Sequence, residues 1–202
     1  MRQQLFTLIK CFSLLMLFFL YGCESSDYIY ILSRNSQSKE GNLVLKYNLF
    51  SENISHIGIA FDNNPDSFVY HVSYDKKNHL GSSLLKEKFT DFWSSPQSED
   101  NRIWALPISK KELKNAKKYI YNLEKETIKF DFDPKTDLGL YCSEFVYNVL
   151  KNSNSRRFQT NSVCKELKGY QKIIAGENYL CYYPADFFLV YKDIKELKNC
   201  LK

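Results

Sequence analysis

Residues 140–151 read Leu-Tyr-Cys-Ser-Glu-Phe-Val-Tyr-Asn-Val-Leu-Lys, and this stretch constrains both the fold and the chemistry of the chain. Its apolar residues recur with the period of an α-helix, which predicts a helix with one buried face. Cys142 lies at or just inside the start of this helix, where backbone N–H groups have no partner within the helix and the dipole is positive. Such a position favours a thiolate, and the same amides can bind an oxyanion. The alternative is an inert, buried structural cysteine.

Two histidines on a pair of strands are the candidate partners of this thiol. Residues 55–61 and 67–74 are rich in β-branched and aromatic residues and flank a polar turn, which predicts a hairpin. A two-residue turn at Asn63-Asn64 would place His56 directly across from His71, whereas a turn one residue longer would move one ring to the other face. His71 would then fix the tautomer of His56, unless it is an ordinary polar strand residue.

The remaining elements predict a single mixed α and β domain, which suits a chain of 202 residues. We expect further strands over residues 41–47, 102–108 and 187–191, and we expect the last of these to be central because all of its residues are apolar. Short helices are expected over residues 84–93 and from Asp193 onward.

A second long helix is predicted to follow Ser109. Ser109 and Glu112 have the spacing of a capping box, in which each side chain satisfies a backbone N–H of the first turn. Apolar residues then recur at helical spacing and predict one buried stripe. The stripe consists of Leu113, Ala116, Ile120 and Leu123.

Residues 1–23 resemble an export signal. Arg2 and Lys10 accompany an apolar run over residues 11–20, which is too short to span a membrane as a helix and fits the core of a signal peptide. The run ends in Leu20-Tyr21-Gly22-Cys23, which resembles the lipobox of bacterial lipoproteins. In those proteins the cysteine is acylated and becomes the new N-terminus.

We therefore expect three segments. Residues 1–22 are predicted to be a lipoprotein signal peptide, residues 23–39 the lipidated Cys23 and its tether, and residues 40–202 the folded domain. The protein would be exported and lipid-anchored in the bacterial cell envelope, on the periplasmic side, because two or more acyl chains anchor a protein stably. An ordinary secretory signal and a retained N-terminal anchor helix are the alternatives.

Cysteine usage and charge exclude several classes of function. If Cys142 is a reactive thiol, one disulfide among Cys164, Cys181 and Cys200 is possible, and the sequence does not assign it. The absence of CxxC and HExxH motifs leads us to expect no metal and no cofactor. The net charge of +5 falls to +3 when Arg2 and Lys10 leave with the signal. The lysines are scattered among acidic residues, so no nucleic-acid partner is expected.

Five motifs in chain order resemble the permuted papain-like amidases of the YaeF/YiiX type. These are relatives of NlpC-type cell-wall peptidases and, more distantly, of lecithin–retinol acyltransferase. The motifs are Gly41-Asn42-Leu43-Val44, Ser55-His56-Ile57-Gly58-Ile59, Val69-Tyr70-His71, Tyr141-Cys142-Ser143-Glu144-Phe145-Val146 and Tyr183-Pro184-Ala185-Asp186. The resemblance covers roughly residues 40–191. It implies an α+β, circularly permuted papain-like (NlpC-like) fold, with an antiparallel sheet packed against the helix that carries the cysteine nucleophile.

The resemblance also implies roles for individual residues. Cys142 would be the nucleophile and His56 the general base, and His71 occupies the place of the family's third polar residue. Many relatives carry Glu there, and a His resembles the acyltransferase branch. The implied function is that of a cysteine hydrolase (amidase, peptidase or acyltransferase-like) that forms a thioester acyl-enzyme. Its substrates would be peptidoglycan-type peptides or lipid acyl amides and esters.

Two rival classes remain open. One is a non-catalytic envelope lipoprotein that binds wall fragments or a protein partner on the same fold, and it predicts that the Cys142→Ala variant keeps its activity. The other is a metal-dependent enzyme, for which the chain offers three histidines and no recognisable ligand motif.

Overall fold

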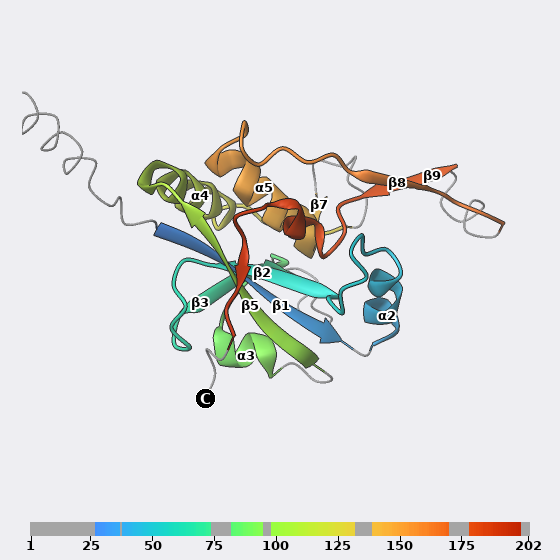
Figure 1. Ribbon diagram of the computed structural model, residues 1–202, viewed down its shortest axis with the longest axis horizontal. Coiled ribbons are helices and arrows are strands. Elements are labelled where there is room, and N and C mark those ends of the chain that lie inside the picture. The colour runs from blue at the N-terminus through green and yellow to red at the C-terminus, as the bar shows by residue number, and fades with distance from the viewer. Residues whose placement is uncertain are drawn as a thin grey trace, which may run out of the picture.

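A six-stranded antiparallel sheet organises the structure (Figure 1). The computed structural model of the protein describes residues 27–36, 38–73, 82–94, 98–131, 139–169 and 178–198. The strand order is β10-β5-β1-β2-β3-β4, so the longest strands, β1 and β5, lie side by side. The strands are β1 (Asp27–Ser36), β2 (His56–Ala60), β3 (Phe68–Val72), β4 (Leu84–Lys88), β5 (Ser98–Ile108) and β10 (Lys195–Glu196).

Helices cover both faces of this sheet (Figure 1). The long helices α4 (Lys110–Leu123) and α5 (Cys142–Ser153) lie on one face, and the short helix α3 (Phe89–Trp93) lies on the other. Burial follows strand parity, because Ile57 and Ile59 of β2 belong to the core under α4 and α5, whereas Ala60 belongs to the core under α3. The predicted α+β class with an antiparallel sheet is confirmed.

The two long helices agree with their sequence patterns. The Glu112 carboxylate accepts from the Ser109 N–H at 2.7 Å, and the Ser109 hydroxyl accepts from the Glu112 N–H at 3.3 Å, which completes the predicted capping box. The stripe of α4 is buried apart from the half-buried Leu113. α5 begins at Cys142 and buries the predicted face, which comprises Phe145, Val146, Val149 and Leu150.

The start of the domain was predicted wrongly. Residues 27–36, which the sequence analysis assigned to the tether, form β1, and β1 pairs with both β5 and β2. Its side chains Ile29 and Ile31 are completely buried in the core under α5. The strand begins only four residues after the proposed lipid site at Cys23, where the sequence analysis expected a tether.

Residues 41–47 were predicted as a strand but belong mainly to helix α2 (Lys39–Leu45). The Ser38 hydroxyl caps this helix by accepting from the N–H of Gly41 at 3.0 Å. A Cβ atom at Gly41 would lie 2.0 Å from the carbonyl oxygen of Ser36, so the tight turn between β1 and α2 requires glycine. The cap thus fixes the start of a helix in a segment whose apolar residues 43–45 also suit a strand.

Residues 84–93 divide into two elements where one helix was predicted. The first half is strand β4, which extends the sheet at β3, and the second half is the five-residue helix α3. The division follows the burial pattern, since Phe89, Phe92 and Trp93 are buried against the sheet while β4 lies at the edge.

The hairpin that carries the two histidines forms with a longer loop than predicted. Residues 61–67 connect β2 to β3 instead of a two-residue turn at Asn63-Asn64. Two successive Asx turns extend this loop, because the Asp62 carboxylate accepts from the N–H of Asn64 and the Asn64 side chain accepts from the N–H of Asp66.

The longer loop changes the register but not the faces of the strands. Ile59 pairs with Tyr70, which places Gly58, rather than His56, across from His71. The shift from the predicted register is two residues, so every side chain stays on its predicted face. His56 and His71 are consequently diagonal neighbours on the face that also carries α3.

The predicted C-terminal strand is absent. Residues 187–191 contain the 3₁₀ helix η1 (Phe187–Val190), and the predicted helix after Asp193 is replaced by β10, which pairs with β5. Phe187 and Phe188 are buried in the core, so their apolar character is explained by burial in a turn of helix. Short apolar runs do not distinguish strands from buried helices.

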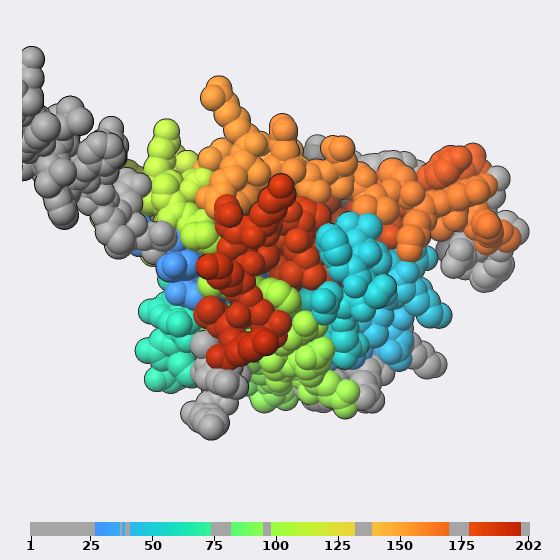
Figure 2. All heavy atoms as spheres, viewed as in Figure 1, coloured from blue at the N-terminus to red at the C-terminus, as the bar shows by residue number. Residues whose placement is uncertain are grey.

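A separate two-stranded sheet projects from the body as an arm (Figures 1 and 2). It consists of β8 (Val163–Glu166) and β9 (Tyr179–Tyr182), and Cys164 and Cys181 are cross-strand partners joined by a disulfide. This settles the pairing that the sequence left open, and Cys200 lies outside the described residues. A short parallel pair, β6 (Lys129–Phe130) and β7 (Gly139–Leu140), leads into α5. No helix in the described part of the chain has the length and apolarity that a membrane span requires.

Candidate active site

Cys142 is the first residue of α5, and its side chain is buried with 9% of its surface exposed. The N-cap residue, Tyr141, makes no side-chain capping bond, so the backbone N–H groups of the first turn are not covered from that side. The N–H groups of Ile57, Ser143 and Cys142 itself interact with the sulfur and favour the thiolate. Burial has the larger effect, and it raises the pKa of the Cys142 thiol above its ordinary value.

His56, His71 and Glu87 form a hydrogen-bonded row. Nε2 of His71 lies 3.0 Å from Oε2 of Glu87, and Nδ1 of His71 lies 2.9 Å from Nε2 of His56. The bond to His71 holds the pKa of the Glu87 carboxyl below its usual value. An ionised carboxylate only accepts, so neutral His71 donates from Nε2 and accepts the Nε2–H proton of His56 at Nδ1. In this arrangement the Nδ1 atom of His56 carries no proton.

The row depends on a close approach of β2 to β3. A Cβ atom at Gly58 would lie 2.6 Å from the Val69 side chain and 3.1 Å from the Cβ of His71, so a larger residue would push the strands apart. The Phe92 ring supports both imidazoles from α3, with its centroid 5.6 Å from that of His56 and 5.1 Å from that of His71. The ring contacts fix the plane of each imidazole.

Arg34 of β1 is a cation common to the whole group. Its side chain is buried, its guanidinium lies 4.5 Å from the centroid of the Phe92 ring, and it donates to the Phe92 carbonyl oxygen. The positive charge lowers the pKa of both acids, Cys142 and Glu87. It also lowers the pKa of His56 and of His71. A thiol, two imidazoles and a carboxylate are thus gathered within electrostatic reach of one guanidinium.

The Cys142 thiol and the two imidazoles approach the Arg34 guanidinium from different faces of the sheet. Cys142 comes from the α5 side and lies against the N–H of Ile57, the residue that follows His56. Among the described residues, no hydrogen bond joins the Cys142 thiol to the His56 ring, whereas the bond between the two histidines is present. Catalytic hydrogen bonds are often long or poorly aligned until substrate is bound.

The group is neutral at rest except for Glu87 and Arg34. Burial, and then the Arg34 charge, lowers the pKa of His56 well below 6.5. Burial also lowers the pKa of His71, although the bond to Glu87 opposes this effect. With the thiol pKa raised at the same time, the directions of the shifts favour a thiol and a neutral imidazole at neutral pH, rather than a thiolate–imidazolium pair.

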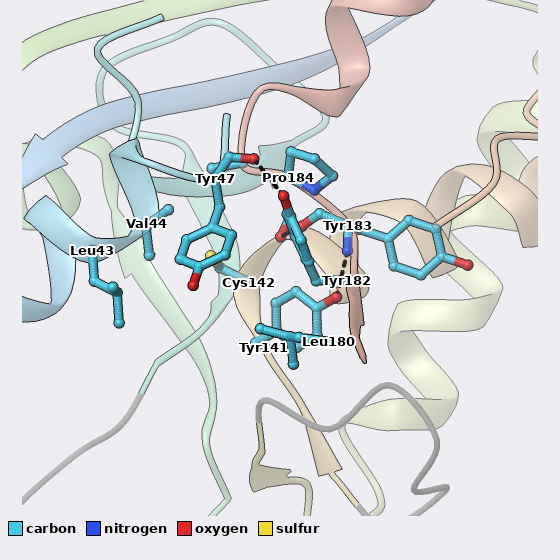
Figure 3. Close-up of a pocket in the computed structure, with 11 residues that line it drawn as sticks. Leu43, Val44, Tyr47, Tyr141, Cys142, Leu180, Tyr182, Tyr183 and Pro184 are labelled. Atoms are coloured by element: carbon cyan, nitrogen blue, oxygen red, sulfur yellow. Dashed lines mark hydrogen bonds between the residues drawn. The ribbon is translucent and has the colours of Figure 1, made fainter. Parts of the chain in front are cut away.

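An apolar cavity of about 300 Å³ opens beside Cys142 (Figure 3). Its walls come from α2 and Tyr47, from the start of α5, and from Leu180 to Ala185 at the end of the arm. Figure 3 shows the Cys142 sulfur behind the Tyr47 ring as one looks into this cavity. The buried thiol therefore borders a space in which a substrate can lie.

The Tyr183-Pro184-Ala185-Asp186 motif holds these walls together. The Tyr183 N–H donates to the Tyr141 phenol oxygen at 2.7 Å, and the Ser143 hydroxyl donates to the Tyr183 carbonyl oxygen at 2.6 Å. The buried Asp186 carboxylate accepts from the backbone N–H groups of residues 49 and 50, at 2.9 and 2.7 Å. The motif thus acts as a structural clamp between α5 and the segment after α2.

Sequence reasoning missed two members of the group. Arg34 lies in a strand that was not predicted, and its signal in the sequence is a cation two residues after the apolar run of residues 29–32. Glu87 lies in β4, where a helix was expected, and pairs with Val69, which places it diagonally across from His71. His79, the third histidine, lies outside the described residues, as does Cys23.

The comparisons support the fold. A scan against protein-family models found no match, and no curated protein was found to be similar. Among solved structures, the chain is similar to one described as the metalloprotein YiiX from Escherichia coli O157:H7, with a TM-score of 0.56 and 13% sequence identity. The match covers 87% of this chain and 97% of that chain. The protein therefore has a YiiX-type α+β fold, and at this identity the likeness concerns the fold alone.

The word metalloprotein in that description led us to test the donor atoms of this chain. In the ranges that the structure describes, no group of three or more His, Cys, Asp or Glu side chains is arranged to hold a metal ion. Both ring nitrogens of His71 are already engaged, one with His56 and one with Glu87. The side chains of the described residues therefore do not fit a metal centre.

Proposed function

We propose that this protein is a cysteine-dependent hydrolase of the permuted papain-like type, which acts through a thioester acyl-enzyme. Cys142 would be the nucleophile and His56 the general base, and His71 would hold the His56 ring. The observation that carries the proposal is the gathering of these side chains around the buried Arg34 beside a cavity. Titratable groups whose pKa values are shifted by burial and by a specific charged neighbour, next to a cavity, are candidates for a functional site.

The proposed reaction begins from the neutral thiol. As Sγ of Cys142 attacks the carbonyl carbon of an amide or ester, Nδ1 of His56 takes the thiol proton. The backbone N–H of Cys142 at the start of α5 stabilises the oxyanion. His56 then returns the proton to the leaving amine or alcohol, which departs as the thioester forms. Water, deprotonated by His56, hydrolyses the thioester to a carboxylic acid and restores the thiol.

Glu87 enters this scheme as a positioning residue. By accepting from Nε2 of His71, it makes Nδ1 of that ring an acceptor, and this in turn directs the His56 proton to Nε2. The carboxylate therefore sets the tautomer of the base from two side chains away.

The proposal includes the export of the protein. Residues 1–22 would be removed as a lipoprotein signal and Cys23 acylated, which would anchor the domain on the periplasmic side of the bacterial envelope. Peptidoglycan-type peptides and lipid acyl amides or esters are then the substrates within reach.

The direct test is acyl-enzyme formation from p-nitrophenyl acetate at neutral pH. We expect a burst of nitrophenol and a mass increase of one acetyl group on the peptide that contains Cys142. The Cys142→Ala variant should lose both, and His56→Ala should lower kcat/KM by about 10²- to 10⁴-fold. His79→Ala is the matched control, and its rate should equal that of the wild type. Acetylation that persists in Cys142→Ala would refute the proposal.

A non-catalytic lipoprotein on the same fold is the competing interpretation. The raised pKa of the Cys142 thiol and the missing hydrogen bond between Cys142 and His56 favour it. It predicts no acetylation at all, and binding of wall fragments that survives Cys142→Ala. The same set of variants therefore decides between the two functions.

A further inference from the structure

The cavity beside Cys142 is lined by side chains that suit hydrocarbon. Leu43, Val44, Leu180 and Pro184 contribute aliphatic walls, and the rings of Tyr47 and Tyr182 contribute aromatic ones. No charged residue is among the described residues that line it. A substrate portion that enters this space gains from burial of apolar surface and finds no ionic partner.

The polar groups around the cavity are largely occupied by one another. The Tyr182 hydroxyl donates to the Tyr47 carbonyl oxygen at 3.1 Å. The Tyr141 phenol oxygen accepts from the Tyr183 N–H, and the Ser143 hydroxyl donates to the Tyr183 carbonyl oxygen. Figure 3 shows the first two of these bonds crossing the wall of the cavity. The walls are held together by these bonds and present mainly carbon to the interior.

The apolar surface continues outside the cavity. Leu43, which lines the cavity, is 52% exposed, and Leu49 and Phe50, which follow Tyr47 in the chain, are 47% and 48% exposed. The N–H groups of Leu49 and Phe50 are fixed by Asp186, next to Ala185 of the cavity wall. Exposed large apolar side chains that gather beside an apolar cavity are typical of a surface that contacts lipid or another apolar partner.

We propose that this cavity binds the acyl chain of a lipid ester or amide, with the carbonyl carbon held at Cys142. The proposal rests on the hydrolase function above and selects acyl lipids over wall peptides as the substrate class. Stem peptides of the wall carry carboxylates, which need cationic partners that the cavity walls do not provide. At roughly 30 Å³ per carbon-sized unit, the share of one water molecule in the liquid, the cavity holds a chain of about eight to ten carbons.

The acyl step conserves atoms and protons. Sγ of Cys142 forms a bond to the acyl carbon, and the bond from that carbon to the alcohol oxygen or amine nitrogen breaks. The thiol proton passes through His56 to the leaving group. Water then supplies one hydroxyl to the acyl carbon and one proton to the sulfur, which releases a fatty acid.

The kinetic test compares p-nitrophenyl acetate, butyrate, octanoate and palmitate with the full-length purified protein. Each methylene that the cavity buries should raise kcat/KM by up to about four-fold, so the rate should climb from acetate to octanoate and stop rising before palmitate. Val44→Trp fills the cavity and should lower the octanoate-to-acetate ratio at least ten-fold. The matched control is Val190→Trp, at a 41% exposed site outside the cavity, and it should leave the ratio unchanged.

A binding test separates the cavity from the chemistry. The Cys142→Ala variant should bind decanoate, the probe in this test, as followed by isothermal titration calorimetry, and Val44→Trp in the same background should abolish binding. Binding of the probe without any acetate cleavage would reject the hydrolase function and leave the acyl site standing. Cys142-dependent acetate cleavage without chain-length preference or probe binding would overturn the acyl site alone. Faster cleavage of a carboxylate-bearing wall peptide than of the octanoyl ester would also overturn it.

Discussion

At the scale of single residues, the position of Cys142 at a helix start suggests a thiolate paired with an imidazolium. The burial of Cys142 and His56 favours the neutral forms of both side chains instead. The helix start and Arg34 favour the thiolate, but burial of the sulfur outweighs both. The same burial suppresses the protonated form of His56. A neutral resting pair reacts with a carbonyl only when the proton moves together with the attack, which protects the thiol from chance electrophiles.

This protonation state predicts the pH dependence of Cys142 alkylation. Because the folded pKa is raised, the thiolate fraction is small at neutral pH, and it keeps growing with pH beyond the ordinary thiol value of 9.0. The rate of reaction with iodoacetamide, followed by mass spectrometry of the Cys142 peptide, should increase about ten-fold per pH unit from pH 7 to 9. A plateau between pH 5 and 8 would reveal a thiolate–imidazolium pair and contradict this assignment.

Glu87→Gln should impair the base without unfolding the protein. The glutamine amide can either accept from or donate to Nε2 of His71, whereas the carboxylate can only accept. Both rings should therefore populate a mixture of tautomers. We expect kcat/KM to fall between about ten-fold and 10⁴-fold, the larger figure being the cost of losing a carboxylate that orients the base directly. Nitrogen NMR shifts of His71 should report the change in tautomer, a readout that a purely structural role would not move.

The matched control for that variant is Glu124→Gln. Glu124 is the C-cap of α4 and lies 3.7 Å from the exposed Lys86, a pair expected to contribute little to stability. Its rate and its histidine spectrum should equal those of the wild type. An equal loss of activity in both variants would remove the positioning role from Glu87.

At the scale of elements, the patterns with one dominant local cause were predicted well. The capping box fixed the start of α4, and the apolar period gave α5 its buried face. Strand parity placed His56 and His71 on one face although the register was wrong by two residues, because an even shift conserves the face. The predicted contact between the two histidine rings is therefore present, although the turn was predicted wrongly.

The elements that were missed depend on distant partners. β1 becomes the centre of the sheet because β2 and β5 flank it, and β5 lies far along the chain, after β3, β4 and α3. The residue before the 3₁₀ helix, Asp186, is bonded to backbone more than one hundred residues away. Glu87 meets His71 only through the pairing of β3 with β4. No local pattern contains these causes.

The arm offers a prediction at this scale, since β8 and β9 form a sheet of their own. The double variant Cys164→Ala/Cys181→Ala should lose about 2–3 kcal/mol of stability in the arm, because the disulfide closes a loop of 17 residues. Hydrogen exchange should rise over residues 163–182 and stay unchanged in β1 and β5. Because Leu180 and Tyr182 line the cavity, preference for octanoyl ester should fall as well. Faster exchange throughout the six-stranded sheet would contradict the independence of the arm.

At the scale of the whole molecule, the position of β1 sets the smallest unit that can fold. A chain that begins at residue 27 retains every strand of the sheet, whereas one that begins at residue 40, the predicted start of the domain, lacks the strand that joins β5 to β2. We expect the first to give cooperative thermal unfolding and a circular dichroism spectrum with the same strand and helix signals as that of the full chain. The second should be insoluble or unfolded, because the loss of Ile29 and Ile31 leaves a cavity in the core. A folded chain from residue 40 would disprove the central role of β1.

The early start of β1 also limits how the domain can lie if Cys23 carries a lipid. Four residue steps separate Cys23 from Asp27, a leash of at most about 14 Å. The opening next to Cys142 adjoins α2, which follows the opposite end of β1, a strand of ten residues and therefore about 33 Å long. With β1 perpendicular to the bilayer and so short a tether, the opening of the cavity would lie far above the lipid surface. If the protein takes its acyl chain from the membrane that anchors it, the domain would have to lie on its side, with β1 parallel to the lipid surface.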